Sequence, residues 1–255
     1  MSPQPERDSS DAASTTSPYN RILLKVSGES LSEKGEMGFD RAAIEAASAQ
    51  IKSVHDCGVQ LAVVCGGGNL IRGAQLTGPL DIDRGTADYM GMLGTVINSL
   101  ALQSALERSG IETRVLSAIA IDQVVEPYIR RRAQRHLQKG RVVILAAGTG
   151  NPFVSTDTAA ALRARELGCN VILKGTKVGG VFDKDPVVHD DAELIERLTY
   201  REVITRDIGV MDHTAITMCH EARMPIIVFD MLDKKNVLNV IGHDRNVGTL
   251  IAHND

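Results

Sequence analysis

AAGTGNPFVSTD, residues 146–157, follows the apolar, strand-like run 141–145 and leads into TAAALR, residues 158–163, which is typical of the start of a helix. Glycines at such a strand-to-helix junction let the backbone approach a ligand closely, and hydroxyl groups supply hydrogen-bond donors without charge. The N-terminus of the following helix presents unpaired N–H groups to an anion. The stretch therefore predicts a phosphate-binding loop, and the alternative is an ordinary polar loop with a helix N-cap.

Strand-like and helical patterns alternate on both sides of this stretch. Apolar strand-like runs cover 21–26, 59–65, 113–116, 170–173, 226–229 and 249–251, and apolar residues at helical spacing cover 41–57, 86–108, 158–167, 200–206, 212–223 and 234–241. This alternation predicts an α/β fold, a three-layer αβα sandwich with a mostly parallel central sheet. Because ligands of such sheets bind at the carboxyl ends of the strands, we expect the loops there to converge on one crevice.

Composition narrows the classes of function. The 255 residues carry a net charge of −4 and 43% hydrophobic residues, which suffices for one sizeable core and gives no global basic surface for nucleic acid. Four widely spaced cysteines without a C-x-x-C pair predict neither a zinc knuckle nor a disulfide framework. No apolar run approaches the roughly 20 residues of a membrane span, so we expect no membrane partner and a cytoplasmic location.

The first 18 residues, MSPQPERDSSDAASTTSP, are polar and rich in Ser, Asp and Pro. Such a composition has too little apolar surface to bury, and we expect residues 1–18 to form a disordered tail. Residues 19–255 are expected to form a single domain.

Lys25 stands near the end of the first strand-like run, directly before Val26, Ser27 and Gly28. A lysine in a buried strand is costly unless it is paired, so its ammonium is expected to reach an anion. The alternative is a lysine that snorkels to solvent from an edge strand.

Three adjacent glycines, Gly66, Gly67 and Gly68, follow the run 59–65, with Arg72 close behind. A loop without side chains suits backbone contact with a phosphate, and an arginine adds a fork of donors. A tight turn that packs a helix against a strand is the alternative.

Three further segments leave alternatives open. Asp88 lies in the first turn of the helix 86–108, where it could simply complement the helix dipole. The basic run 130–136 is typical of a solvated helix face, although it could bind an anionic effector or another subunit. The loop 174–186 could hold an adenine against Phe182, or it could form a β-hairpin around Gly179-Gly180.

Several known motifs are missing. The sequence has no Gly-Lys dipeptide, so it contains no Walker-type P-loop, and the G-x-G-x-x-G spacing fails at Ile71 and at Phe153. It has no G-x-S-x-G elbow and no H-E-x-x-H helix. Phosphate-binding loops with a strand-end lysine and an arginine are the parts of a phosphoryl-transfer site without a P-loop.

Five segments in this order resemble the bacterial UMP kinases, a family within the amino acid kinase superfamily. They are LKVSGE (24–29), GGGNLIRG (66–73), DYMGML (88–93), GTGNPFVSTD (148–157) and KGTKVGGVF (174–182). The likeness extends from about Tyr19 to Ile251. It implies transfer of a phosphoryl group from ATP to UMP, giving ADP and UDP, in de novo pyrimidine nucleotide biosynthesis.

The resemblance implies roles for individual residues. Lys25 and Arg72 would stabilise the transferred phosphoryl group and Asp157 would orient the cationic groups around it. ATP would contact Lys25, Val26, Ser27, Gly28, Gly68, Arg72, Thr176, Phe182 and Asp185. UMP would be held by Gly67, by Asp88 at the ribose hydroxyls, and by Thr149, Gly150, Asn151, Pro152, Phe153, Val154, Ser155 and Thr156. Mg²⁺ would ride on the ATP phosphates without a metal site of the protein's own.

The resemblance also implies a homohexamer, activation by GTP and inhibition by UTP, with the loop 33–38 and the arginine cluster near Arg130 as candidate contributors. A mobile surface loop and a solvated helix are the alternatives there. The sequence departs from the family at Gly179, where aspartate is common, at Gly175, where alanine is common, and at Ile71, where an aromatic residue is frequent. The change at Gly179 puts nucleotide affinity in question rather than the reaction.

The chemistry agrees with this interpretation independently. A nucleoside monophosphate has a second pKa of about 6, so its attacking oxygen is already anionic at neutral pH and no general base is needed. Cations and backbone donors must instead bring two polyanions together. Two alternatives remain: another amino acid kinase relative with a different acceptor, and a non-catalytic nucleotide-sensing protein of the same fold.

Overall fold

The computed structural model describes residues 17–71, 76, 80–186, 188–231, 233–242 and 247–254. The expected tail, except Ser17 and Pro18, and the candidate Arg72 lie outside the described residues. The elements are β1 (Arg21–Val26), the 3₁₀ helix η1 (Gly28–Leu31), α1 (Arg41–Asp56), β2 (Gln60–Cys65), α3 (Arg84–Arg108), β3 (Thr113–Ser117), β4 (Glu126–Pro127), α4 (Arg130–Gln138), β5 (Val142–Ala146), α5 (Thr156–Leu167), β6 (Val171–Thr176), β7 (Arg197–Thr199), α6 (Tyr200–Thr205), α7 (His213–Ala222), β8 (Ile226–Asp230), α8 (Lys234–Ile241) and β9 (Thr249–Ala252).

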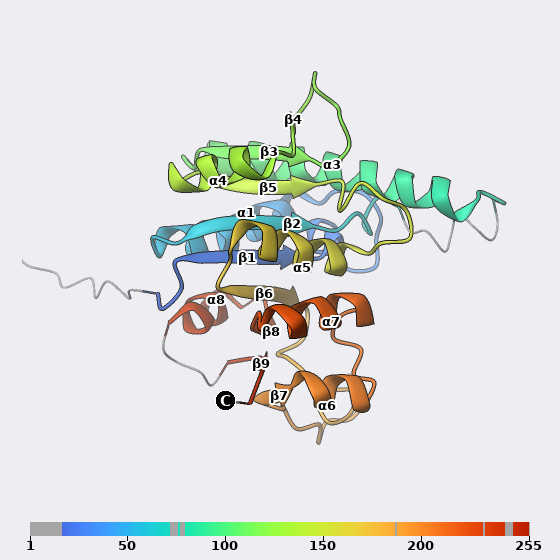
Figure 1. The fold of residues 1–255 in the computed structure, drawn as a ribbon. Helices are drawn as coiled ribbons and strands as arrows, with labels where there is room; N and C mark the ends of the chain where they lie inside the picture. The colour runs from blue at the N-terminus through green and yellow to red at the C-terminus, as the bar shows by residue number, and fades with distance from the viewer. Residues whose placement is uncertain are drawn as a thin grey trace, which may run out of the picture.

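Among the described residues, the strands form one nine-stranded sheet in the order β4-β3-β5-β2-β1-β6-β8-β9-β7 (Figure 1). Every pair of neighbours is parallel except β8 and β9, which confirms the predicted mostly parallel sheet. The sequence did not predict β4 and β7, because two or three residues are too few to show a period.

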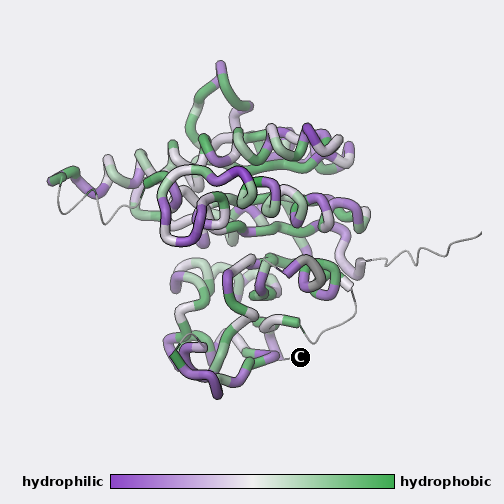
Figure 2. The backbone as a smooth tube through the Cα atoms, turned by 180° about the vertical axis from the view of Figure 1, so that it is seen from behind, coloured by the Kyte–Doolittle hydropathy of each residue, from purple (hydrophilic) through white to green (hydrophobic). Residues whose placement is uncertain are grey.

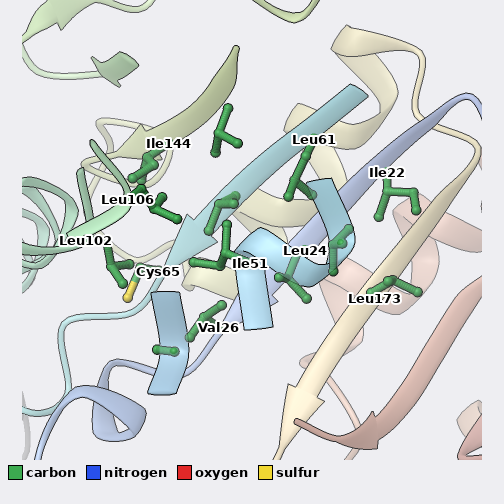
Figure 3. Packing of buried hydrophobic residues seen from close by; sticks show 14 of the residues in the cluster. Ile22, Leu24, Val26, Ile51, Leu61, Cys65, Leu102, Leu106, Ile144 and Leu173 are labelled. Carbon is green, nitrogen blue, oxygen red and sulfur yellow. The ribbon is translucent and has the colours of Figure 1, made fainter. Parts of the chain in front are cut away.

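The helices cover both faces of this sheet, which is the predicted three-layer sandwich. Side chains of β1 alternate between two cores: Ile22, Leu24 and Val26 pack with α1, α3 and α8, whereas Leu23 packs with α4, α5 and α7. Figure 3 shows the first core, in which Ile51 of α1 lies over the strand residues. Figure 2 shows that the central strands are apolar along most of their length, as expected for strands buried on both faces.

Several boundaries differ from the predicted ones, and two of these differences have clear physical reasons. Helix α5 begins at Thr156 rather than at Thr158, because the Ser155 hydroxyl caps it by accepting from two backbone N–H groups. Strand β6 continues past Leu173 to Thr176, because it stays paired with β8 as far as Asp230. Lys174, which the sequence placed in a loop, is therefore a strand residue.

The basic run 130–136 forms most of α4, and its arginines are exposed, as predicted for a solvated face. His136 is the exception: it is buried, and its Nε2 lies 3.2 Å from the Glu126 carboxylate. In the described part of the chain, no helix is long and apolar enough to cross a membrane.

Candidate active site

Four loops meet at the carboxyl edge of the sheet, because they follow the adjacent strands β5, β2, β1 and β6 (Figure 1). The loops after β1 and β2 touch: the Gly66 N–H donates to the Val26 carbonyl at 3.0 Å. A Cβ atom on Gly28 would lie 2.5 Å from the Gly66 oxygen and 2.8 Å from the Gly68 nitrogen. Only glycine fits at position 28, since the obstacle is backbone.

Two lysines face each other across neighbouring strands, because Lys25 of β1 and Lys174 of β6 are register partners. The Asp157 carboxylate, from the first turn of α5, lies between them. Lys25 Nζ is 3.0 Å from Oδ1 as an ion pair without hydrogen-bond geometry, and Lys174 Nζ donates to Oδ2 at 2.9 Å. All three side chains are nearly buried, with 12%, 13% and 16% of Lys25, Lys174 and Asp157 exposed.

Burial lowers the pKa of Lys174, and the nearby Lys25 ammonium lowers it further, whereas the Asp157 carboxylate raises it. The Lys174 ammonium also donates to the Val210 carbonyl. The Asp157 carboxylate thus favours the charged form of this lysine in a site where burial penalises charge. Such a group is suited to exchange its carboxylate for a phosphate oxygen.

Sequence reasoning did not select Lys174 as a site residue. The signal was the same as for Lys25: a lysine at the end of an apolar strand. Because a glycine and polar residues follow Lys174, the apolar run seems to end at Leu173, and Lys174 is assigned to the loop.

Asp212 is a second residue that the sequence did not select. It caps α7 by accepting from the Ala215 N–H at 3.0 Å, and it also accepts from the hydroxyls of Thr158, at 2.8 Å, and Ser155. Burial raises the pKa of Asp212, but these hydrogen bonds outweigh it, so the pKa is lowered overall. Its only sequence signal was an N-cap residue before a helical pattern.

Asp88 and the loop 149–156 come together, as the convergence of loops predicts. The Phe153 N–H donates to Asp88 Oδ2 at 2.8 Å, and Arg84 Nε donates to Oδ1 at 2.9 Å. Helix α3 begins at Arg84, because the Asp83 carboxylate caps it by accepting from the Thr86 N–H, so the predicted position of Asp88 in the first turn is wrong. Phe153 itself has a positive φ of 66° and is 74% exposed, so its ring points away from the core.

A cavity of about 160 Å³ lies between the triple-glycine loop, the start of α3 and the loop 149–156. Glycine is required at Gly67 because a Cβ atom there would meet the Gly91 oxygen at 2.7 Å. Of the residues expected to hold UMP, the cavity is lined by Gly67, Asp88, Val154 and Thr156. Thr149, Gly150, Asn151, Pro152, Phe153 and Ser155 belong to the same loop but not to this lining.

Buried polar side chains of α3 hold the loops in place. Asn98 donates to the Gly66 carbonyl at 2.7 Å and exchanges amide hydrogen bonds with Asn69, and both asparagines are fully buried. The Thr95 hydroxyl accepts from the Ala147 N–H at 2.7 Å. The glycine loops are thus supported by a satisfied buried network, which keeps their geometry fixed.

The expected ATP residues divide into two groups. Val26, Ser27 and Gly28 directly follow Lys25 of the lysine pair, and Gly68 lies against Gly28. Thr176 lies at the end of β6 and lines, with Lys174, a second cavity of about 350 Å³.

Phe182 and Asp185 stand outside that lining. Phe182 forms an antiparallel bridge with Leu194, and the Ile195 N–H donates to the Val181 carbonyl at 2.8 Å. The alternative, a hairpin around Gly179-Gly180, is wrong. The segment after these glycines pairs with residues 193–195 and not with the segment just before them. The contact of Phe182 with adenine stays a prediction.

Among the described residues, no group of three or more His, Cys, Asp or Glu side chains is placed to hold a metal ion. The Asp157 carboxylate is already paired with two ammonium groups. Mg²⁺ carried by the phosphates of the nucleotide stays a prediction from the sequence.

A mostly parallel sheet with glycine loops, two paired lysines and one carboxylate at its carboxyl edge defines a class of phosphoryl-transfer proteins that lack a P-loop. The model of the amino acid kinase family matches residues 20–230, and the chain belongs to this family.

Its relatives include a uridylate kinase of Rubrobacter xylanophilus, 52% identical over 247 residues that cover 96% of each chain. The UMP kinase of Bacillus anthracis has a similar structure, with a TM-score of 0.87, 37% identity and coverage of 93% of this chain and 98% of that one. For the UMP kinase of Ureaplasma parvum the TM-score is 0.85 at 34% identity, with coverage of 92% and 99%.

Proposed function

We propose that this chain transfers the γ-phosphoryl group of ATP to UMP, giving ADP and UDP. The observation that carries the proposal is the Lys25–Asp157–Lys174 arrangement, which lies where two glycine loops touch. A cavity lined by Gly67 and Asp88 adjoins these loops. The relatives named uridylate kinase or UMP kinase, matched over nearly their whole length, support UMP as the acceptor.

The two lysines supply the positive charge that the reaction requires. In the protein alone both ammonium groups are paired with Asp157. When the triphosphate binds, they turn toward the transferred phosphoryl group, and Asp157 keeps both of them charged and aligned. Preorganised cations in a site with little water are worth a few kcal/mol of barrier each. Arg72 is proposed to add its donors from the triple-glycine loop.

The backbone supplies the remaining donors. Because Gly28 and the triple-glycine loop carry no side chains, their N–H groups can approach phosphate oxygens closely. The UMP phosphate oxygen attacks directly, since it is already anionic at neutral pH and needs no base. When bound to the ATP phosphates, Mg²⁺ neutralises part of their charge.

Asp88 and the loop 149–156 are proposed to recognise the nucleoside part of UMP. The Asp88 carboxylate accepts a hydrogen bond from the Phe153 N–H and thereby holds the loop in position. It can also accept hydrogen bonds from the ribose hydroxyls. The product UDP places the reaction in pyrimidine nucleotide biosynthesis.

We extend the proposal to a homohexamer whose contacts include α3. Tyr89, Leu93 and Ile97 recur every four residues on one face of this helix and are each 45–49% exposed. An apolar stripe of this kind is typical of a protein interface. Leu93→Glu is expected to give a smaller species in light scattering, and an unchanged mass would remove α3 from the interface.

Activation by GTP and inhibition by UTP are part of the same proposal. The loop 33–38 is tied to the glycine loop, because the Gly38 N–H donates to the Asn69 carbonyl at 2.7 Å and Asn69 Nδ2 donates back to Gly38 at 2.9 Å. A ligand that moved this loop would therefore act on the phosphate-binding backbone.

Coupled ADP release from Mg-ATP tests the function directly, with UMP, CMP, dUMP and acetylglutamate as separate acceptors. The expected result is a strong preference for UMP. Turnover with another acceptor would leave phosphoryl transfer standing and overturn the assignment of UMP.

A further inference from the structure

The Asp212 carboxylate joins the N-termini of two helices. Its Oδ1 accepts from the Ala215 N–H at 3.0 Å, as the N-cap of α7, and from the Thr158 hydroxyl at 2.8 Å. Its Oδ2 accepts from the Ser155 hydroxyl. A helix cap needs only the first of these contacts, and the other two reach α5.

Ser155 carries this connection onward to the catalytic carboxylate. Its hydroxyl oxygen caps α5 by accepting from the N–H groups of Asp157 and Thr158, both at 3.1 Å. Asp212 is thus two hydrogen bonds away from the backbone of Asp157. The Asp157 side chain in turn holds Lys25 and Lys174.

The segment before Asp212 reaches the same lysine from the other side, because the Val210 carbonyl accepts from Lys174 Nζ. Lys174 is faced by Asp157 from α5, by Lys25 from β1 and by the Asp212 carboxylate from the start of α7. Cys219 of α7 is also close to both carboxylates, but burial and these charges raise the pKa of its thiol to about 12, so it stays neutral.

We propose that Asp212 is a positioning residue for the phosphoryl transfer, which fixes the N-terminus of α5 and thereby the carboxylate that aligns Lys25 and Lys174. This inference rests on the proposed function. Positioning is sensitive to small displacements, since an error of about 1 Å at a reacting group lowers turnover by about 100-fold. A mere cap would affect stability and leave turnover unchanged.

Asp212→Asn keeps the size of the side chain and removes its charge. Asp40→Asn is the matched control, since Asp40 is also a half-buried N-cap, which accepts from the Ala43 N–H at 2.7 Å at the start of α1. We expect Asp212→Asn to lower kcat by at least about tenfold with both KM values within about threefold, and Asp40→Asn to keep kcat within about twofold. Equal kcat in the two variants would overturn the proposal.

The charge of Lys174 gives a readout that does not depend on activity. Asp212 raises the pKa of Lys174, so its loss must move the deprotonation of that amine to lower pH. Competitive acetylation at a series of pH values, followed by mass spectrometry of the Lys174 peptide, measures this midpoint. A midpoint in Asp212→Asn equal to that of the parent enzyme would also overturn the proposal.

Thr158→Val provides a second variant if Asp212→Asn folds poorly. It removes the hydroxyl that donates to Asp212 and preserves the shape of the side chain. We expect a smaller loss of kcat, which is not additive with the loss in Asp212→Asn, because both changes act on one contact. Additive losses would contradict the shared contact. An inactive parent enzyme would instead refute the proposed function, while the acetylation midpoint would still test Asp212.

Discussion

Asp157→Asn is the substitution that bears most directly on the site. It preserves the size of the side chain and removes the negative charge between two ammonium groups at 3.0 and 2.9 Å. Lys25 and Lys174 then remain opposite each other on adjacent strands and lose the carboxylate that forms an ion pair with both. Both the stability of the protein and the chemistry should respond.

The size of the stability loss follows from burial. Removing one partner of a buried ion pair costs about 3–5 kcal/mol of unfolding free energy. The three side chains retain 12–16% exposure, so water screens them in part, and we expect the lower limit, about 3 kcal/mol. Asp56→Asn is the control, because Asp56 pairs with Lys52 at 2.9 Å with 52% and 42% exposure, and such a pair contributes at most about 0.5 kcal/mol.

The loss should also depend on pH with a definite sign. The pKa of Lys174 in the folded protein is lowered from 10.5, so its charged form is disfavoured by folding. That unfavourable contribution is fully present below the folded-state pKa and disappears as the pH rises from there to 10.5. Without Asp157 the pKa falls further. The deficit of Asp157→Asn should therefore be largest near neutral pH and shrink as the pH rises toward 10.

Urea unfolding of the two variants and the parent between pH 7 and 10 measures the deficit, and coupled ADP release measures turnover. We expect kcat of Asp157→Asn to fall about 100-fold, equivalent to about 2.7 kcal/mol of barrier, through loss of alignment. If Asp157→Asn lost no more stability than Asp56→Asn, the ion-pair reasoning would be refuted. If its kcat stayed within about threefold of the parent, the alignment role would be refuted.

Three further substitutions, one of them with a matched control, test other parts of the site. Lys25→Ala should lower kcat far more than it raises KM for UMP, and equal effects in steady-state kinetics would show that this lysine only binds. Gly28→Ala should lower the unfolding free energy measured in urea by about 1–3 kcal/mol, because its Cβ would lie 2.5 Å from the Gly66 oxygen. Gly91→Ala is the control: a Cβ there would have no atom within 4 Å, so the unfolding free energy should rise by about 0.5–1 kcal/mol. Asp88→Ala should raise KM for UMP about tenfold or more with little change in kcat, because the Phe153 N–H loses its acceptor; an unchanged KM would remove this aspartate from the acceptor site.

The sequence predicted the architecture well because the signals for it are local. Each buried strand was a short apolar run, and the loops after four of these runs carried the glycines. Parallel pairing then guarantees that the ends of adjacent strands meet, as the Lys25 and Gly66 regions do. The meeting of Asp88 with the loop 149–156 needed only this convergence, not knowledge of side-chain geometry.

The parts that the sequence missed depend on register and on contacts between distant segments. Lys174 was placed in a loop because only its pairing with β8 shows that the strand continues. Asp212 looked like any helix cap, and its contacts with Ser155 and Thr158 arise from the packing of α7 against α5. Phe182 pairs with a segment that no local turn signal indicated.

The pairing of Lys25 with Lys174 is difficult to explain by stability alone. Like charges on neighbouring strands repel, and replacing buried charged groups by apolar residues of similar size often stabilises a protein. Among the described residues, Asp157 is the one carboxylate in ion-pair contact with the two ammonium groups, so two positive charges lie beside a single negative charge at the carboxyl edge of the sheet. A reaction that joins two polyanions needs such a charge, held in place before the substrates meet. The arrangement is therefore unfavourable for folding and favourable for phosphoryl transfer, which is the expected signature of a site selected for its chemistry.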